Sequence, residues 1–298
     1  MELNRLLSGT GVALVTPMDV QGGVDYQALG RLIEHNITHG VNYLVVLGTT
    51  AESVTLNPEE KSLIASFVRQ QVAGRIPLVL GHGGNDTAAL VAGFEHMDLS
   101  GYSALLSVTP YYNRPSQKGL EAHYLALAAA SPLPILLYNV PSRTGCNLEN
   151  ETIWALLAQS PKFIGVKEAS ADFDKTLDLL AQRPEGFLVI SGDDGTASEA
   201  ILAGADGVIS VIGQALTAPF VALIHASSIG DRQKTQTLMA DLSDLIDLIF
   251  EEGNPTGIKA LLSILGICRS NVRLPLIPAS TGLESKLRLS LLKRENFV

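Results

Sequence analysis

A lysine ends a short apolar run near the middle of the chain. Residues 163–168 read Phe-Ile-Gly-Val-Lys-Glu, which would place Lys167 at the carboxyl end of a buried strand. A neutral lysine amine can attack a ketone and become an iminium, which lets the neighbouring carbon lose a proton. A solvated lysine has a pKa of about 10.4, so this chemistry needs a dry setting. A lysine at a strand end is also a common solvated terminator, so its neighbours must decide between the two interpretations.

Polar residues that could assist such a lysine follow three other apolar runs. Thr49 and Thr50 lie in the segment 48–53, whose hydroxyls and backbone amides could hold a carboxylate. Tyr112 follows the run 104–109, and Tyr138 and Arg143 end and follow the run 134–139. A phenol can shuttle protons, and an arginine can grip a carboxylate with two hydrogen bonds. Together these residues favour Schiff-base chemistry over a solvated strand end.

Eight short apolar runs would have to position these residues. Their apolarity is nearly continuous, as expected of parallel strands buried on both faces, and segments with helical signals separate them. This alternation predicts an α/β protein with a (β/α)8 barrel, and a doubly wound open sheet is the alternative. In a barrel, the loops after the strands form the active site. The runs span residues 12–17, 43–48, 77–81, 104–109, 134–139, 163–167, 187–191 and 207–211.

Helix-starting residues support the alternation, and the end of the chain differs from the rest. Asn57-Pro58-Glu59-Glu60 combines a capping side chain, an early proline and acids in the first turn. Similar starts occur at Asp25, Asp86, Ser116 and 149–151. After Gly230-Asp231, helical segments at 234–252, 258–265 and 285–292 follow one another without strands. We therefore predict a catalytic barrel at 1–230 and a small C-terminal helical domain at 231–298.

Composition excludes several classes of protein. The 298 residues are 46% hydrophobic and carry a formal net charge of −9, with scattered basic residues, so we expect no nucleic-acid partner and no membrane association. No apolar stretch reaches the roughly 18 residues of a membrane span, and the amino terminus lacks an apolar leader. The two cysteines have no metal-type spacing. We expect a cytoplasmic protein.

No metal site is predicted. His35 and His39 are four residues apart on an expected helix, but no acid lies between them, so a surface histidine pair is the better interpretation. Asp193 and Asp194 could bind a cation, yet no further ligand cluster accompanies them. We interpret these two acids as helix caps and loop anchors, and we expect no metal or other cofactor.

The motifs resemble the dihydrodipicolinate synthase family of pyruvate-dependent class I aldolases. The resemblance extends from 11–17 to 273–275 and is most specific at 109–117, 138–145, 165–169 and 191–194. It implies a (β/α)8 TIM barrel with a small C-terminal helical domain, and a lyase that condenses pyruvate with L-aspartate 4-semialdehyde in lysine and diaminopimelate biosynthesis. It also implies a homo-oligomer, a dimer of dimers.

The resemblance assigns roles by position. Lys167 would form the Schiff base with pyruvate, beside Tyr138 as proton donor and acceptor. Thr49 would connect Tyr138 to Tyr112, and that second tyrosine would come from the neighbouring subunit. In the substrate pockets, Thr50 would hold the pyruvate carboxylate. The other substrate-binding residues would be Arg143, which would bind the carboxylate of the second substrate, Ile209 and Gly192.

Two other functions remain open. A sister aldolase, such as N-acetylneuraminate lyase or a 2-keto-3-deoxy sugar acid aldolase, would share Lys167 and Tyr138, but Arg143 and Tyr112 speak against it. A non-catalytic paralogue that binds a small metabolite would not need these residues.

Two departures from the family pattern concern the pocket. Ala51 replaces a frequent glycine, where a positive φ would strain alanine, and Gly213-Gln214 replaces Ala-Asn.

The third departure concerns regulation. In members of the family that lysine inhibits, two histidines and a glutamate lie near the effector, and here Pro58, Lys61 and Ala89 occupy the matching positions. The remaining effector-site residues are Ser53, Asn85 and Tyr111.

We predict weak or absent inhibition by lysine. Lys61 would repel the ammonium group of the effector, and the acid that would bind this group is missing. A steady-state assay with increasing lysine should show little loss of rate. Potent inhibition would contradict the assignment of these positions.

Overall fold

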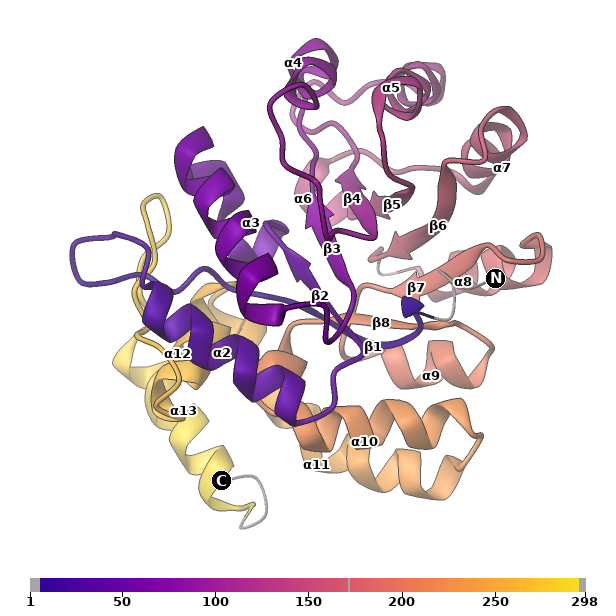
Figure 1. The fold of residues 1–298 in the computed structure, drawn as a ribbon. Coiled ribbons are helices and arrows are strands. Elements are labelled where there is room, and N and C mark those ends of the chain that lie inside the picture. The colour runs from indigo at the N-terminus through magenta and orange to yellow at the C-terminus, as the bar shows by residue number, and fades with distance from the viewer. Residues whose placement is uncertain (1–5, 171, 295–298) are drawn as a thin grey trace.

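Eight parallel strands form a closed barrel in which each strand pairs with its neighbours in sequence, and β8 pairs with β1. The computed structural model describes residues 6–170 and 172–294, and Figure 1 shows the helices outside the strands. The expected (β/α)8 barrel is confirmed. The strands are β1 (Gly9–Ala13), β2 (Tyr43–Val46), β3 (Leu78–Gly81), β4 (Ala104–Val108), β5 (Ile135–Asn139), β6 (Phe163–Glu168), β7 (Leu188–Ser191) and β8 (Gly207–Ser210).

The predicted capping residues begin the helices that follow the strands. Asp25, Asn57, Asp86 and Ser116 each accept a hydrogen bond from a backbone amide in the first helical turn. At Asn57 the Glu60 side chain returns the bond, so the first turn is closed on both sides. The helices that follow the eight strands are α2 (Tyr26–Thr38), α3 (Pro58–Val72), α4 (Thr87–Gly93), α5 (Gln117–Ala130), α7 (Asn150–Gln159), α8 (Phe173–Gln182), α9 (Ala197–Leu202) and α10 (Thr217–Ser228).

The first strand lies earlier than predicted. It spans Gly9–Ala13, whereas the apolar run predicted 12–17. A Cβ on Gly11 would lie 2.2 Å from the buried Tyr43 ring, so glycine is required where β1 passes this aromatic side chain. Gly11 therefore allows a close contact inside the barrel, one residue before the start of the predicted run.

The pairing of β5 with β6 shifts by one residue. Ile135 pairs with Phe163, but Leu136 pairs with Gly165, so Tyr138 pairs with Lys167. Continuing the first register would have set Tyr138 opposite Val166 and turned Lys167 to the other face of the sheet, because side chains alternate along a strand. Phe163 and Val166, three residues apart, accordingly both pack in the core between the sheet and the outer helices. The shift brings Lys167 and Tyr138 to the same face.

Three helices follow the barrel, as predicted: α11 (Arg232–Glu251), α12 (Thr256–Ile264) and α13 (Thr281–Leu292). The last begins four residues earlier than predicted, because Ser280 caps it by accepting from the Leu283 amide. Between α12 and α13, the Ile267 carbonyl accepts a hydrogen bond from Arg31 of α2, and α13 is yellow in Figure 1. Apolar side chains of all three helices join the core between the sheet and α2, α3 and α10. The boundary at residue 231 stays a prediction.

A buried ion pair joins α12 to the loop after β2. Lys259 is 0% exposed, and its Nζ lies 2.5 Å from Oε1 of Glu52, which is also buried. The Asn271 carbonyl accepts from the same ammonium, and the Arg273 amide donates to the other Glu52 oxygen. Burial lowers the pKa of Lys259, and the carboxylate of Glu52 opposes that shift. The C-terminal helices thus hold the loop that carries Thr49 and Thr50.

None of the helices within 6–170 and 172–294 combines the length and apolarity that a bilayer crossing requires.

We predict that Lys259→Met lowers the free energy of unfolding by about 3–5 kcal/mol, because it leaves the Glu52 carboxylate buried without its partner. Adding Glu52→Gln should recover part of the loss. Urea titration measures both effects. Lys286→Met is the matched control, since it breaks an exposed pair with Glu251 and should cost less than about 1 kcal/mol. Equal losses for the two single variants would contradict the prediction.

Candidate active site

Lys167 and Tyr138 face each other inside the mouth of the barrel. They are paired residues on neighbouring strands, and the Lys167 Nζ lies 4.3 Å from the centroid of the Tyr138 ring. Both side chains are buried, with Lys167 5% exposed. An amine against a phenol ring in a dry setting is the arrangement that Schiff-base chemistry requires, because the nucleophile and a group able to move protons lie together.

Small and apolar residues surround this lysine. Ile190 pairs with Lys167 across β6 and β7, and Ile209 lies in the same interior cluster as Tyr138. Gly192 lies against the lysine stem, because a Cβ built there would be 2.9 Å from the Lys167 Cε. Of the residues that the resemblance placed in the pocket, Gly192 and Ile209 therefore both lie in the barrel interior around the lysine and tyrosine.

The acid next to Lys167 in sequence is bound elsewhere. Glu168 lies on the opposite face of β6, where Lys175 forms an ion pair with it at 2.9 Å. Asn139 and the Ser170 amide donate to the same carboxylate. Among the described residues, no carboxylate forms an ion pair with Lys167. Its ammonium form therefore lacks the anionic partner that would hold a structural lysine in place.

The loop after β2 carries the two threonines in a 3-10 turn, η1 (Thr49–Ala51). Thr50 is buried, and Thr16 fixes the turn by donating to the Ala51 carbonyl at 2.8 Å. The positive φ of this loop falls on Leu47 and Glu52 rather than on Ala51. Alanine at position 51 therefore carries no left-handed strain, and this departure from the family pattern is accommodated by the backbone.

Arg143 lies on the short helix α6 (Pro141–Thr144) that follows β5. Its guanidinium is anchored at one point, by a 3.3 Å hydrogen bond from Nη2 to the backbone carbonyl of Asn254. The side chain of Asn254 donates to the Thr50 hydroxyl at 3.0 Å. The structure thus brings two predicted substrate-binding residues, Thr50 and Arg143, to one residue just before α12.

The acids after β7 act as structural anchors, as predicted. Asp193 accepts from the Thr196 amide at 2.9 Å, at the start of α9. Asp194 accepts from the amides of Val211 and Ile212 and so joins β7 to the segment after β8. Burial is the main cause that raises the pKa of Asp194 to about 6, although these hydrogen bonds oppose it.

Gln214, the second departure from the family pattern, is also structural. It is fully buried, accepts from the Val15 amide at 2.8 Å and donates to the Ala13 carbonyl at 3.0 Å. It therefore closes the rim between β8 and β1.

The two histidines at the end of α2 bind backbone oxygens. His35 contacts the Ala215 carbonyl, and His39 contacts the His35 carbonyl.

Tyr112 is separated from the buried pair. Its side chain is 85% exposed, and its φ of 74° holds the backbone in the left-handed region. In this one chain, therefore, the relay from Tyr138 through Thr49 to Tyr112 stays a prediction. Of the effector-site residues, Asn85 donates to the Tyr111 carbonyl at 3.4 Å, and Ser53 begins the next turn, η2 (Ser53–Thr55).

Sequence reasoning missed the residues that support the site from behind. Asn254 lies between the expected helices 234–252 and 258–265 and was given no role, although it contacts the Thr50 side chain. Lys259 interrupts the apolar run 258–265, but helical periodicity gives no sign of its burial, because it lies on the side of the helix away from Ile258 and Leu261. Glu168 and Lys175 are seven residues apart, and nothing in that spacing indicates their ion pair.

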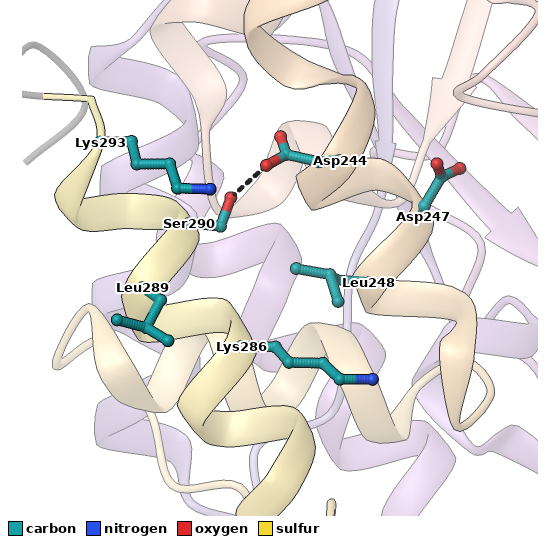
Figure 2. Close-up of a pocket in the computed structure, with 7 residues that line it drawn as sticks. All are labelled: Asp244, Asp247, Leu248, Lys286, Leu289, Ser290 and Lys293. Atoms are coloured by element: carbon teal, nitrogen blue, oxygen red, sulfur yellow. Dashed lines mark hydrogen bonds between the residues drawn. The ribbon is translucent and has the colours of Figure 1, made fainter.

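A surface hollow of about 370 Å³ lies between α11 and α13, away from this site. Figure 2 shows Ser290 bonded to Asp244 within it, and Lys286 is paired with Glu251. Three of its polar side chains, Asp244, Lys286 and Ser290, are therefore already bonded within the protein. Across the described residues, no three His, Cys, Asp or Glu side chains are grouped to hold a metal ion.

A (β/α)8 barrel in which a lysine and a tyrosine face each other at the ends of β6 and β5 defines the class of Schiff-base-forming lyases. Sequence comparison gives the family. The profile of the Dihydrodipicolinate synthetase family matches residues 6–293, so the chain belongs to this family. A 4-hydroxy-tetrahydrodipicolinate synthase of Parabacteroides distasonis is 45% identical over 282 residues, covering 95% of each chain.

Solved structures of dihydrodipicolinate synthases have the same fold as this chain. The chloride-inhibited dihydrodipicolinate synthase from Acinetobacter baumannii, complexed with pyruvate, is 37% identical with a TM-score of 0.93, covering 98% of this chain and 100% of that one. A monomeric dihydrodipicolinate synthase variant is 36% identical with a TM-score of 0.94, covering 99% of each chain.

We predict that Gly192→Ala slows the formation of a borohydride-reducible adduct at Lys167 with a small 2-oxo acid by about tenfold or more. The added Cβ would displace the lysine stem, and small misplacements of a reacting group are costly. Gly30→Ala on α2 is the control, because its Cβ would meet only ordinary contacts at 3.7 Å. Mass spectrometry over time measures the rate. An unchanged rate in the first variant would show that the lysine tolerates the contact.

Proposed function

We propose that this protein is an enzyme that condenses pyruvate with L-aspartate 4-semialdehyde, the 4-hydroxy-tetrahydrodipicolinate synthase reaction of lysine and diaminopimelate biosynthesis. The observation that carries the proposal is the buried Lys167 amine 4.3 Å from the Tyr138 ring centroid. A relative that is 45% identical over 95% of the chain bears this activity as its name. The reaction occurs in biosynthesis, so we place it in the cytoplasm.

The reaction begins with the Lys167 amine attacking C2 of pyruvate. Loss of water gives an iminium, and removal of a proton from C3 then gives an enamine. Tyr138, whose ring the amine contacts, would carry these protons between the lysine, the departing water and C3. The Thr50 hydroxyl would hold the pyruvate carboxylate next to this pair.

The second substrate would bind through its carboxylate to Arg143, which offers two parallel hydrogen bonds to such a group. The enamine carbon attacks the aldehyde, and the new oxygen takes a proton. The amine of the second substrate then attacks the iminium carbon, closes the ring and releases the Lys167 amine. The acid beside Lys167 in sequence takes no part in these steps, because it faces away from the pocket.

We predict that pyruvate and borohydride add a stable adduct to Lys167, because borohydride reduces the imine to an amine. Lys167→Ala should give no adduct. Lys162→Ala, at the opposite end of the same strand, should react like the natural protein. Peptide mapping by mass spectrometry identifies the modified residue. An absent adduct in the natural protein would refute every Schiff-base mechanism for this chain.

Substrate choice separates the proposal from a sister aldolase. Arg143 beside the pocket suits a second substrate with a carboxylate close to its aldehyde, rather than a polyhydroxylated chain. Turnover with aspartate 4-semialdehyde in the presence of pyruvate, compared with cleavage of N-acetylneuraminate, decides between them. Activity only on N-acetylneuraminate would exclude the proposal.

We also propose that the working enzyme is a homo-oligomer, a dimer of dimers, in which Tyr112 of one subunit completes the proton relay of the next. The support is the 85% exposure of Tyr112 together with its constrained backbone, since a tyrosine held outward lies ready for a partner surface. A monomeric variant has nearly the same fold, so the fold alone does not require assembly.

We predict that co-expressed Tyr112→Phe and Lys167→Ala chains recover activity that neither has alone. Each single variant should lose roughly tenfold or more, because proton transfer or the nucleophile is missing. In a mixed dimer, one site receives Lys167 from one chain and Tyr112 from the other. Steady-state rates of purified mixed oligomers measure the recovery. Mixed oligomers without recovery would show that Tyr112 serves its own chain.

A further inference from the structure

Asn254 joins the two groups to which the proposed function assigns the substrate carboxylates. Its side-chain Nδ2 donates to the Thr50 Oγ1 at 3.0 Å, and its backbone carbonyl accepts from the Arg143 guanidinium at 3.3 Å. Asn254 is buried and precedes α12, some 200 residues beyond Thr50 in sequence. Asn254 therefore contacts both residues that the proposed function assigns to the substrate carboxylates.

The direction of the first hydrogen bond determines what Thr50 can do. A hydroxyl carries one hydrogen and can also accept, whereas a carboxylate only accepts. Because Asn254 donates to Thr50, the Thr50 hydrogen is left to be donated to another acceptor. With an acceptor in place of the Asn254 amide nitrogen, Thr50 would donate to that acceptor instead and would turn a lone pair toward the substrate.

The amide has no other protein partner among the described residues. The Asn254 Oδ1 is buried without a hydrogen bond, so the only hydrogen bond of this side chain is the one to Thr50. An asparagine kept for local folding would bind nearby backbone groups, as Asn57 does at the start of α3. The Asn254 side chain instead makes its hydrogen bond to a residue that precedes it by 204 positions.

We propose that Asn254 is a positioning residue of the reaction, which orients the Thr50 hydroxyl to donate to the pyruvate carboxylate and holds Arg143 beside it. The inference rests on the proposed function, because it takes Thr50 as the carboxylate ligand. Lys259, in the first turn of α12, fixes this segment through its ion pair with Glu52. The C-terminal helices thereby set the geometry of the substrate pocket.

Variants at this position test the inference through half-saturation by pyruvate in borohydride trapping. Asn254→Asp is nearly isosteric but takes the Thr50 hydrogen, so it should raise the half-saturating concentration by about tenfold or more. Asn254→Ala removes the bond without taking the hydrogen and should raise it less. The maximal trapping rate should change little in both. If Asn254 only filled space, Asn254→Asp would be the milder change, which would overturn the proposal.

A double variant separates orientation from simple charge repulsion. Once Thr50→Val has removed the hydroxyl, adding Asn254→Asp should cost little more, because the group that it acts through is gone. An additional tenfold loss in the double variant would overturn the proposal. Asn42→Asp is the matched control for charge and should behave like the natural protein, since it precedes β2 at the opposite end of the barrel.

The natural protein distinguishes this inference from the proposed function. If it forms no adduct with pyruvate, the proposed function fails, and the role of Asn254 fails with it. If it forms the adduct and Asn254→Asp saturates at the same pyruvate concentration, only the role of Asn254 is overturned. Urea midpoints of each variant verify that it is folded, and Asn254→Ala provides the comparison with Thr50→Val if the aspartate variant does not fold.

Discussion

The one-residue register shift between β5 and β6 is the constraint on which the site depends. Side chains alternate between the two faces of a sheet, so an uninterrupted register would have left Lys167 among the outer helices and Tyr138 in the barrel. Gly165 is the first residue of β6 in the new register, and a Cβ there would lie 2.6 Å from the Leu188 Cβ of β7. Close packing at this glycine thus accompanies the shift that places Lys167 on the inner face.

The two buried acids near the site are each paired with a lysine other than Lys167. Glu168, one residue after the lysine, faces outward and is neutralised by Lys175, while Glu52 behind the substrate loop is neutralised by Lys259. Both pairs are buried, and neither reaches into the barrel mouth. This arrangement lets a lysine remain inside without an anionic partner, whereas an acid on the same face would bind it as an ion pair.

The sequence was sufficient for the eight strands, the helix caps and the lysine at the end of β6, because each depends on local patterns of apolarity and capping. The apolar pattern could not show that Lys167 and Tyr138 face each other. In a continuous apolar run, nothing indicates which residues point into the barrel and which point outward. The apolar pattern placed β1 too late because continuous apolarity begins only at residue 12, and the role of Gly11 in the strand depends on the distant Tyr43 ring. Asn254 was missed for a similar reason: its partner precedes it by 204 residues.

The ion pair between Glu52 and Lys259 has a consequence for the order in which the chain matures. A nascent chain that ends at residue 230 already contains all eight strands, yet the Glu52 carboxylate would have no ammonium to meet it. Burying that charge unpaired is unfavourable, so the loop after β2 has reason to stay open until α12 docks. A segment synthesised after all eight strands therefore fixes the loop that carries Thr50.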